Sequence, residues 1–294
     1  MALALDGQIL WRDLVIGTGT PLPLAAADSI TGWLDLPAQR GGSTPLAGRH
    51  GSYAGQRLSG NRLVTVALKS DGRYPPEAFA AALAALRRAT APAENPVEEP
   101  LVIRLDGQSL MCQAICLRRS PRVDRHYRLG RSAIAVQWEA TDPRIYAVDE
   151  QIVEVELATT AGGGLDFSGG GLDFTGGLDF GTGQQGGART VTLGGHVPTW
   201  PVLEITGPVT GPVVTLGESG RRLGFDGTWS VLAGQTLLID TYRRTAEIAA
   251  VSVRQRLSIA QWSPLEPGPT LVRFSAAAYN PDTRLRVRFR DAYH

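Results

Sequence analysis

A glycine-rich segment between residues 160 and 187 divides this chain into two halves of different composition. The motif GLDF occurs in it three times, 7 and 6 residues apart, with leucines at Leu165, Leu172 and Leu178. Glycine gives reach and backbone freedom, whereas the repeated Leu and Phe side chains are too apolar for an ordinary flexible linker. We therefore expect a first domain over residues 1–157, a glycine-rich arm over 158–188 that docks partly on a surface, and a second domain over 189–294.

The length of the chain agrees with two domains, because 294 residues at about 150 per domain leave each half able to bury a core. Hydrophobic residues make up 43% and charged residues 19%, which is typical of a globular protein and excludes a disordered polyelectrolyte. The 35 glycines, 19 prolines and 7% aromatic residues favour many turns between short strands. The composition therefore predicts a mainly β fold.

The charge pattern gives no indication of a polyanionic partner. The net charge of +1 creates no general field that would gather nucleic acid or an anionic membrane. The first ten residues, MALALDGQIL, lack the basic region and long apolar core of a signal peptide, and no run of 18 apolar residues occurs. We expect synthesis without a signal peptide, no membrane insertion and no sequence-specific binding of nucleic acid.

The first half is predicted to contain strands and one helix. Residues 75–89 have helical spacing, with Pro76 at the first position, apolar residues on one face and two arginines at the end. Residues 101–105 and 108–117 flank Asp106-Gly107, which predicts a hairpin with a type I′ turn. Alternation of apolar and polar residues predicts the other strands, over 9–16, 30–36, 62–68, 132–140 and 151–157.

The second half has short strand patterns at regular spacing, which suggests an antiparallel sandwich or jelly roll. Asp226-Gly227 is predicted to form a second hairpin turn. The predicted strands cover 189–193, 201–205, 213–216, 221–225, 229–232, 236–240, 245–251, 270–275 and 284–290.

The motifs of enzymes and metal proteins are mostly missing. GTGQQG at 181–186 matches a dinucleotide fingerprint, but it follows a glycine repeat and precedes a strand pattern, so the match carries little weight. The aspartates of the GLDF repeats have the wrong period for calcium-binding nonapeptides, and the histidines are not at zinc-ligand spacing. We expect no cofactor, no metal and no catalytic residues. A carboxylate pair of a glycosidase stays open among Glu204, Asp226, Asp240 and Glu247.

The two cysteines, Cys112 and Cys116, would lie about 13 Å apart on the same face of one strand, which is too far for a disulfide. We interpret both as buried free thiols. The last strand alternates Arg284, Arg286, Arg288 and Arg290 with apolar residues, so one face is cationic. Either an acidic partner or acids on neighbouring strands would neutralise that face.

Aromatic residues of the second half allow two interpretations. They could form a platform on which a sugar ring stacks, or they could fill the core of the sandwich, which is the favoured interpretation. The residues are Trp200, Trp229, Tyr242 and Trp262.

Several stretches taken together resemble the siphovirus distal tail proteins, a phage tail family, especially the minor tail proteins of phages of high-GC actinobacteria. The resemblance covers both halves and lies in the order and spacing of its pieces. The pieces are RHGSY (49–53), YRLGRSAIAVQWEATDPRIY (127–146), the GLDF repeats, WPVLEITGPVTGP (200–212), LLIDTYRRTAEI (237–248), WSPLEPGPTLVRF (262–274) and the terminal VRFRDAY.

The resemblance implies a fold and a structural role. The N-terminal domain would be a β-sandwich with one helix and a long hairpin that assembles into a ring of six copies, and the C-terminal domain a galectin-like β-sandwich. The ring would lie in the virion at the distal end of the tail, after synthesis in the host cytoplasm. It would join the tail tube protein to the tail-tip hub protein and the host-recognition apparatus. The tape measure protein would pass through the ring, and receptor-binding proteins would contact it in some arrangements. No catalytic residues come with the family.

A closed ring needs two complementary patches on each copy, joined head to tail. The charged candidates for this joint are one basic cluster, Arg118, Arg119, Arg122, Arg125, Arg128 and Arg131, and one acidic stretch, Glu94, Glu98 and Glu99. These charges could also simply keep a loop solvated. The alternative function from another class is a carbohydrate-binding or carbohydrate-cleaving module that acts on cell-wall glycan.

Overall fold

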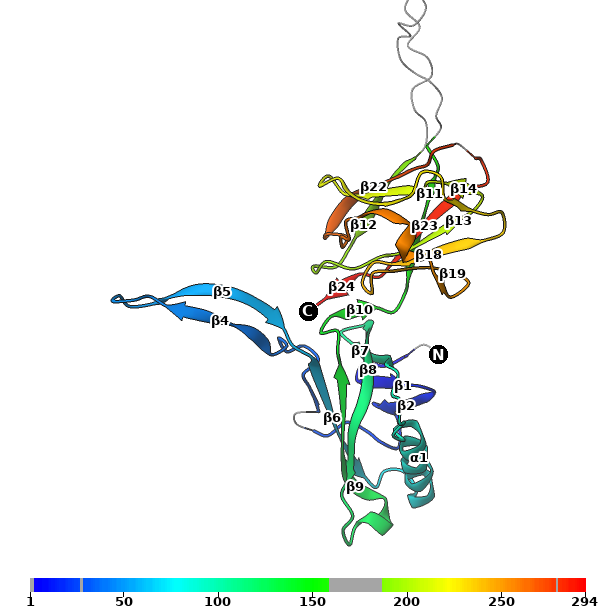
Figure 1. The fold of residues 1–294 in the computed structure, drawn as a ribbon. Helices are drawn as coiled ribbons and strands as arrows, with labels where there is room; N and C mark the ends of the chain where they lie inside the picture. Colours follow the sequence, from blue (N-terminus) through cyan, green and yellow to red (C-terminus); the bar gives the residue numbers. More distant parts are fainter. Residues whose placement is uncertain (1–2, 27–28, 159–186, 279) are drawn as a thin grey trace, which may run out of the picture. The chain divides into compact units, whose positions relative to one another are not determined.

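The computed structural model describes residues 3–26, 29–158, 187–278 and 280–294, which form two compact units (Figure 1). Unit 1 comprises Met1–Val148 with Ala292–His294, and unit 2 comprises Asp149–Asp291. Both are built mainly from antiparallel strands, which confirms the predicted fold class. The GLDF repeats, the GTGQQG motif and most of the expected 158–188 arm lie outside the described residues.

The two units differ from the expected domain limits at two places. Strand β11 (Gln151–Glu156), expected in the first domain, pairs along its whole length with β23 (Arg284–Phe289) of unit 2. The last strand, β24 (Ala292–Tyr293), pairs instead with β10 (Ile145–Ala147) of unit 1. Strand pairing between residues far apart in the chain therefore decides the limits of the units, and composition cannot reveal it.

The main sheet of unit 1 has the order β2-β1-β7-β8-β9-β6-β3, and β10 joins it at β8. The predicted strand over 9–16 is wrong, because a turn at Arg12, with a φ of 54°, divides it into two. The predicted strand over 30–36 ends after two residues, because Gly32 turns the chain with a φ of +79°. The bounds are β1 Gln8–Trp11, β2 Leu14–Gly17, β3 Ile30–Thr31, β6 Arg62–Asp71, β7 Glu99–Leu105, β8 Gln108–Pro121 and β9 Arg131–Ala140.

The predicted helix and the first predicted hairpin are confirmed. Helix α1 covers Pro76–Ala89 and buries Phe79, Leu83 and Leu86 in the core that the sheet shares with it. The indole Nε1 of Trp11 donates a hydrogen bond to the carbonyl of Ala89 at 2.8 Å, which attaches the end of the helix to β1. Asp106 and Gly107 have φ values of 50° and 76° between β7 and β8, as a type I′ turn requires.

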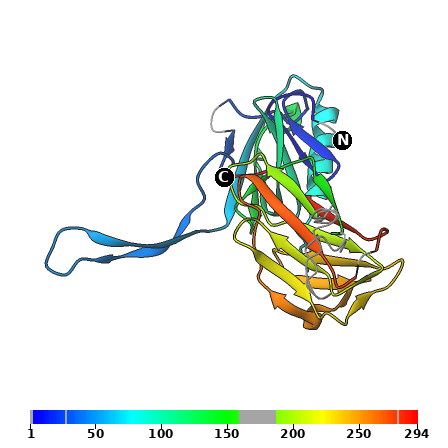
Figure 2. The same ribbon diagram turned by 90° about the horizontal axis from the view of Figure 1, so that it is seen from above.

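A long hairpin leaves the sheet of unit 1 and forms a two-stranded sheet of its own (Figures 1 and 2). It consists of β4 (Gln39–Pro45) and β5 (Ser52–Ser59). No strand was predicted here from alternation, because neither face of the hairpin is apolar. Only the resemblance implied a long hairpin.

Unit 2 is a sandwich of two antiparallel sheets, in the orders β11-β23-β13-β18-β19-β20 and β12-β22-β15-β16-β21. Buried side chains from both sheets form one core. Asp226-Gly227 makes a turn, but the hairpin predicted there is wrong: β16 pairs with β15 and β21, and β17 pairs with β14. The bounds are β12 Ala188–Leu193, β13 Val202–Thr206, β14 Val209–Thr210, β15 Val213–Leu216, β16 Arg221–Phe225, β17 Ser230–Val231, β18 Thr236–Asp240, β19 Thr245–Ile248, β20 Val251–Ser252, β21 Leu257–Ala260 and β22 Gly268–Ser275.

Candidate protein–protein interface

The β4–β5 hairpin is the most exposed element of unit 1. All its strand residues are exposed except Ser59, which is half-buried, and Tyr53 and Leu58 keep 68% and 51% of their surface accessible. A two-stranded ribbon without an apolar face is marginally stable by itself in water. The hairpin therefore has the properties of an element that becomes ordered against another surface.

The β4–β5 hairpin is also basic. Arg40, Arg49 and Arg57 lie on it, and no acidic residue occurs between Asp35 and Asp71. An acidic or neutral surface would be favoured as its partner, because like charges repel across an interface.

A groove of about 380 Å³ lies at a different place on unit 1, beside the sheet edge. One wall is the segment from Ala91 to Val97, and the other is β8 from Ile115 to Leu117. Val97 and Leu117 are 78% and 51% exposed, so apolar side chains of both walls face solvent. Arg12 and Glu99 also line the groove and form an ion pair there, with 2.8 Å between Arg12 Nη2 and Glu99 Oε1. The side-chain hydrogen bond from Arg12 to Glu99 raises the pKa of the guanidinium.

The basic cluster predicted from the sequence gathers at the end of β8 and in the connection to β9, but its members differ in surroundings. Arg119 turns inward and donates to Thr90 Oγ1 at 2.6 Å and to the Arg87 carbonyl at 3.1 Å. Arg122 lies 3.5 Å from Asp124. The remaining members, Arg118, Arg125, Arg128 and Arg131, are exposed.

Two of the three residues of the acidic stretch form hydrogen bonds or ion pairs within unit 1. Glu98 accepts hydrogen bonds from the backbone and hydroxyl of Thr141 at 2.8 and 2.7 Å, and Glu99 is paired with Arg12. Glu94 is exposed. The internal bonds of Glu98 and Glu99 were not foreseen, because Thr141 and Arg12 are distant in the sequence.

The cysteines lie on β8 as predicted, and both are free thiols. Cys112 is fully buried, and burial raises its pKa to about 12. The prediction is wrong in part for Cys116, which is only half-buried because β8 has an irregular register between Cys116 and Arg118. Cys116 lines the groove.

Two arginines of β23, Arg286 and Arg288, pair with acids of the same unit, which supports the interpretation with neighbouring acids for these two, whereas Arg284 donates to the carbonyls of Pro281 and Thr283. Arg286 lies opposite Glu154 and Glu204 in the strand register and bonds Glu154 at 2.7 Å. Arg288 bonds Glu150 at 2.9 Å and also Glu204. These hydrogen bonds raise the pKa values of both guanidinium groups.

The four residues of the predicted sugar platform do not form a common surface. Trp200 and Tyr242 are neighbours, with ring centroids 6.4 Å apart. Trp229 stacks on Phe225 at 4.9 Å, and both Trp229 and Trp262 pack against the core of unit 2. The structure thus supports core filling for Trp229 and Trp262.

The four carboxylates considered as a glycosidase pair have separate surroundings. Glu204 bonds Arg288, Asp226 accepts from the backbone and hydroxyl of Thr228, and Asp240 accepts from the backbone of Arg243 at 2.9 Å. The bonds from Thr228 lower the pKa of Asp226. Glu247 lies on β19, in the same cross-strand row as Glu204, with Leu238 between them.

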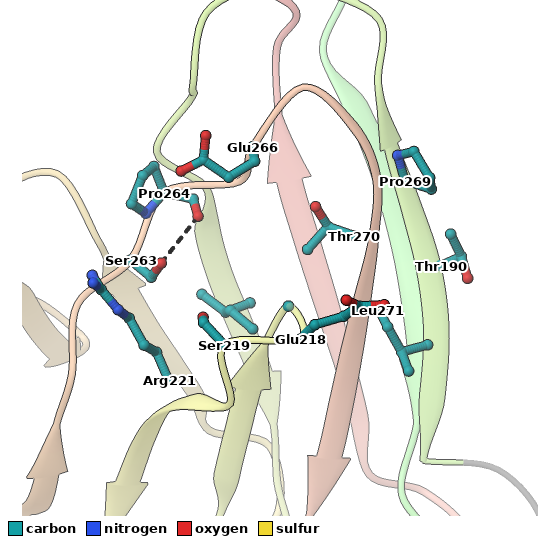
Figure 3. Close-up of a pocket in the computed structure, with 12 residues that line it drawn as sticks. Thr190, Glu218, Ser219, Arg221, Ser263, Pro264, Glu266, Pro269, Thr270 and Leu271 are labelled. Carbon is teal, nitrogen blue, oxygen red and sulfur yellow. Dashed lines mark hydrogen bonds between the residues drawn. The ribbon is translucent and has the colours of Figure 1, made fainter.

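A pocket of about 580 Å³ with mixed polar and apolar lining opens on unit 2 beside the turn from β15 to β16 (Figure 3). The carboxylates of Glu218 and Glu266, the guanidinium of Arg221 and the hydroxyls of Ser263 and Thr270 belong to its lining. Its lining includes no aromatic side chain, so a sugar ring would find no stacking surface there.

Metal sites and membrane-spanning helices can be assessed for the described residues. No group of three His, Cys, Asp or Glu side chains there is arranged to hold a metal ion. No helix there is long and apolar enough to cross a membrane.

Comparison with known proteins places this architecture in one structural class. A scan of the sequence against protein-family models finds no match, and no curated protein matches it. Among solved structures, the chain matches the crystal structure of the Dit protein of SPP1, described as a paradigm of the hub adsorption apparatus in phages that infect Gram-positive bacteria. The TM-score is 0.64 at 12% identity, over 98% of this chain and 99% of that chain.

Two structures of the phage P2 baseplate in its activated conformation also match, one with Ca and one with Sr. Their TM-scores are 0.51 and 0.52 at 11% identity, and each match covers 96% of this chain and at least 96% of the other. At these identities the similarity establishes the fold: this chain has the fold of the SPP1 Dit protein over nearly its whole length.

Proposed function

We propose that this chain is a structural protein of a phage tail tip, a distal tail protein that joins the tail tube to the tail-tip hub. The observation that carries the proposal is the match to the SPP1 Dit protein, which extends over both units and almost all of both chains. A shared fold alone does not establish function. Here the sequence resemblance to siphovirus distal tail proteins supports the same role independently of the fold.

The proposed assembly is a ring of six copies at the distal end of the tail. Its neighbours would be the tail tube protein, the tail-tip hub protein, the tape measure protein and, in some arrangements, receptor-binding proteins. The exposed β4–β5 hairpin supports an assembled state, because its residues bury almost nothing within the unit. Among the charged residues predicted for the joint, the exposed ones remain candidates: Glu94, Arg118, Arg122, Arg125, Arg128 and Arg131.

The proposed role needs no active site. The chemistry of a ring protein lies in its contacts, and the polar side chains described above are mostly bonded within their own unit. A carbohydrate-binding role is not supported by the aromatic residues that suggested it, since Trp229 and Trp262 belong to the core.

Electron cryomicroscopy of tails from virions that carry this gene tests the proposal. The expected result is six-fold density between the tail tube and the tip into which unit 1 and unit 2 can both be fitted. Mass spectrometry of the purified tails should detect the chain in about the same amount as other tip proteins. Absence of the chain from purified tails would refute the proposal, and its presence with another symmetry would refute only the ring of six.

A further inference from the structure

We infer that the β4–β5 hairpin of one copy docks in the groove beside β8 of the next copy and extends the sheet at the free edge of β8. This inference rests on the proposed function, because it describes the joint between neighbouring copies. It replaces the pairing of the basic cluster with the acidic stretch as the main contact of that joint.

The free edge of β8 is the first observation. Strand β7 pairs with β8 only from Gln108 to Ala114. From Ile115 to Pro121, β8 pairs with β9 on one side, and no strand of the described chain pairs with it on the other. An unpaired edge presents backbone donors and acceptors that an added strand can satisfy.

The groove beside this edge is the second observation. Val97 and Leu117 line it from two separate segments and are both exposed, so a strand docked in the groove can cover apolar surface of both segments. Glu94 does not line the groove, but it is exposed between Ala93 and Asn95, which do. The groove thus combines a free backbone edge with two apolar contacts, and the carboxylate of Glu94 lies on the segment that lines it.

The β4–β5 hairpin has the complementary properties. Each of its strands is paired on one side only, so it carries free edges of its own. Its charged side chains are the arginines Arg40, Arg49 and Arg57, which suit the carboxylate of Glu94. Its exposed apolar residues, Tyr53 and Leu58, can contact Val97 and Leu117.

The placement of the two surfaces excludes docking within one copy. Figures 1 and 2 both show the hairpin pointing away from the side of unit 1 that carries α1, β1 and β2. The groove lies on that opposite side, since Trp11 of β1 and Ala89 of α1 line it. Two different surfaces on opposite sides produce a head-to-tail contact, which closes into a ring or continues as a filament.

Cross-linking to Cys116 tests the contact, because this half-buried thiol already lies in the groove. Single replacements Ser43→Cys, Thr44→Cys and Ala54→Cys on the hairpin are treated with a short bismaleimide, in the purified chain and in tails isolated from virions. A head-to-tail joint should give a ladder of covalent dimers, trimers and higher oligomers on a denaturing gel. A contact with two-fold symmetry would stop at dimers.

Two controls make the ladder specific. The same hairpin variants with Cys116→Ser should give no ladder, and Gln108→Cys, an exposed position at the other end of β8, should give none with Cys116 present. Cys112 is fully buried and should not react in the folded chain.

A matched pair of substitutions gives a second readout. Val97→Asp in the groove and Val123→Asp outside it change residues that are 78% and 73% exposed, so neither should disturb folding. Val97→Asp should weaken self-association at least about tenfold, because it places a charge against apolar contacts, and Val123→Asp should leave it unchanged.

The outcomes separate this inference from the proposed function. If the chain forms oligomers or enters tails but gives no Cys116-dependent ladder, the inference is overturned and the tail-tip role stays intact. Equal effects of Val97→Asp and Val123→Asp on self-association would have the same meaning. Absence of the chain from tails, with no association of the purified chain at its highest soluble concentration, would overturn both.

Discussion

Arg288 lies between two carboxylates of unit 2, with its Nη2 2.9 Å from Glu150 Oε2 and its Nη1 hydrogen-bonded to Glu204. The three side chains come from separate parts of the chain, and strand pairing brings them together on one face of the sheet. Cross-strand pairs of opposite charge replace the repulsion that a row of arginines would otherwise create. Arg286 and Arg288 therefore need no external acidic partner.

Glu204→Gln should lower the free energy of unfolding by about 1 to 2 kcal/mol, because Arg288 would lose a charged acceptor in a partly buried network. Glu154→Gln is the matched control: its pair with Arg286 is solvent-exposed, and screening by water leaves such a pair with little effect on stability. Urea unfolding of both variants measures the difference. Equal losses would mean that the second carboxylate on Arg288 adds nothing.

Arg62→Ala should destabilise unit 1 by about 3 kcal/mol or more. The side chain is 1% exposed, and its Nη1 donates to the carbonyls of Gly32, Trp33 and Asp35 while its Nε donates to that of Pro143. Removal of the guanidinium leaves these carbonyls unpaired. Arg57→Ala, at an exposed hairpin position, should change stability by less than about 0.5 kcal/mol. A loss for Arg62→Ala no larger than that of the control would contradict this role, and thermal or urea unfolding measures both.

The stability of unit 1 should fall in alkaline solution through Cys112. Burial raises the pKa of this thiol to about 12, whereas an unfolded thiol has a pKa of about 8.5. The stabilising contribution is thus fully present below pH about 8.5 and is lost as the pH rises toward 12, because only the unfolded chain releases the proton in that window.

Urea unfolding at several pH values from neutral to alkaline, for the natural chain and Cys112→Ala, isolates this effect. The alanine variant should show a shallower alkaline decline, since all other groups are the same in both proteins. Parallel pH profiles would show that Cys112 does not contribute.

Removal of the β4–β5 hairpin should leave unit 1 folded and abolish self-association. Residues 39–59 can be replaced by two glycines, because the backbone N of Gly60 and O of Ala38 are already 2.6 Å apart. The thermal midpoint should change by only a few degrees, since the removed side chains belong to neither core. Circular dichroism and light scattering measure the two effects, and a hairpin-deleted chain that still associates would argue against the hairpin as the joint.

Patterns local in the sequence predicted much of the fold. Helix α1 was predictable because Pro76, the arginines at its end and its apolar face all act within one segment. The β7–β8 turn was predictable because Asp106-Gly107 accepts positive φ. The alternation of β23 likewise predicted which of its residues are buried.

Features that depend on distant partners were not predictable. In the sequence, Arg62 has no feature that distinguishes it from other arginines in strands. It is a buried donor because the distant carbonyls of residues 33, 35 and 143 lie beside it in the fold. The groove beside β8 exists because β7 ends its pairing at Ala114, and no local signal marks that point. The β4–β5 hairpin lacks a buried face, so the periodicity that reveals other strands is absent from it.

The pairing of β10 with β24 makes unit 2 an insertion, because the chain leaves unit 1 after Val148 and returns to it at Ala292. Unit 2 is thus an inserted domain, and the strands of unit 1 that precede and follow it, β10 and β24, pair with each other. Exchange of residues 149–291 for another domain with neighbouring termini would preserve the sheet of unit 1, whereas a cut after residue 157 would remove its last strand. The whole of unit 2 can therefore be replaced while every strand pairing of unit 1 stays the same.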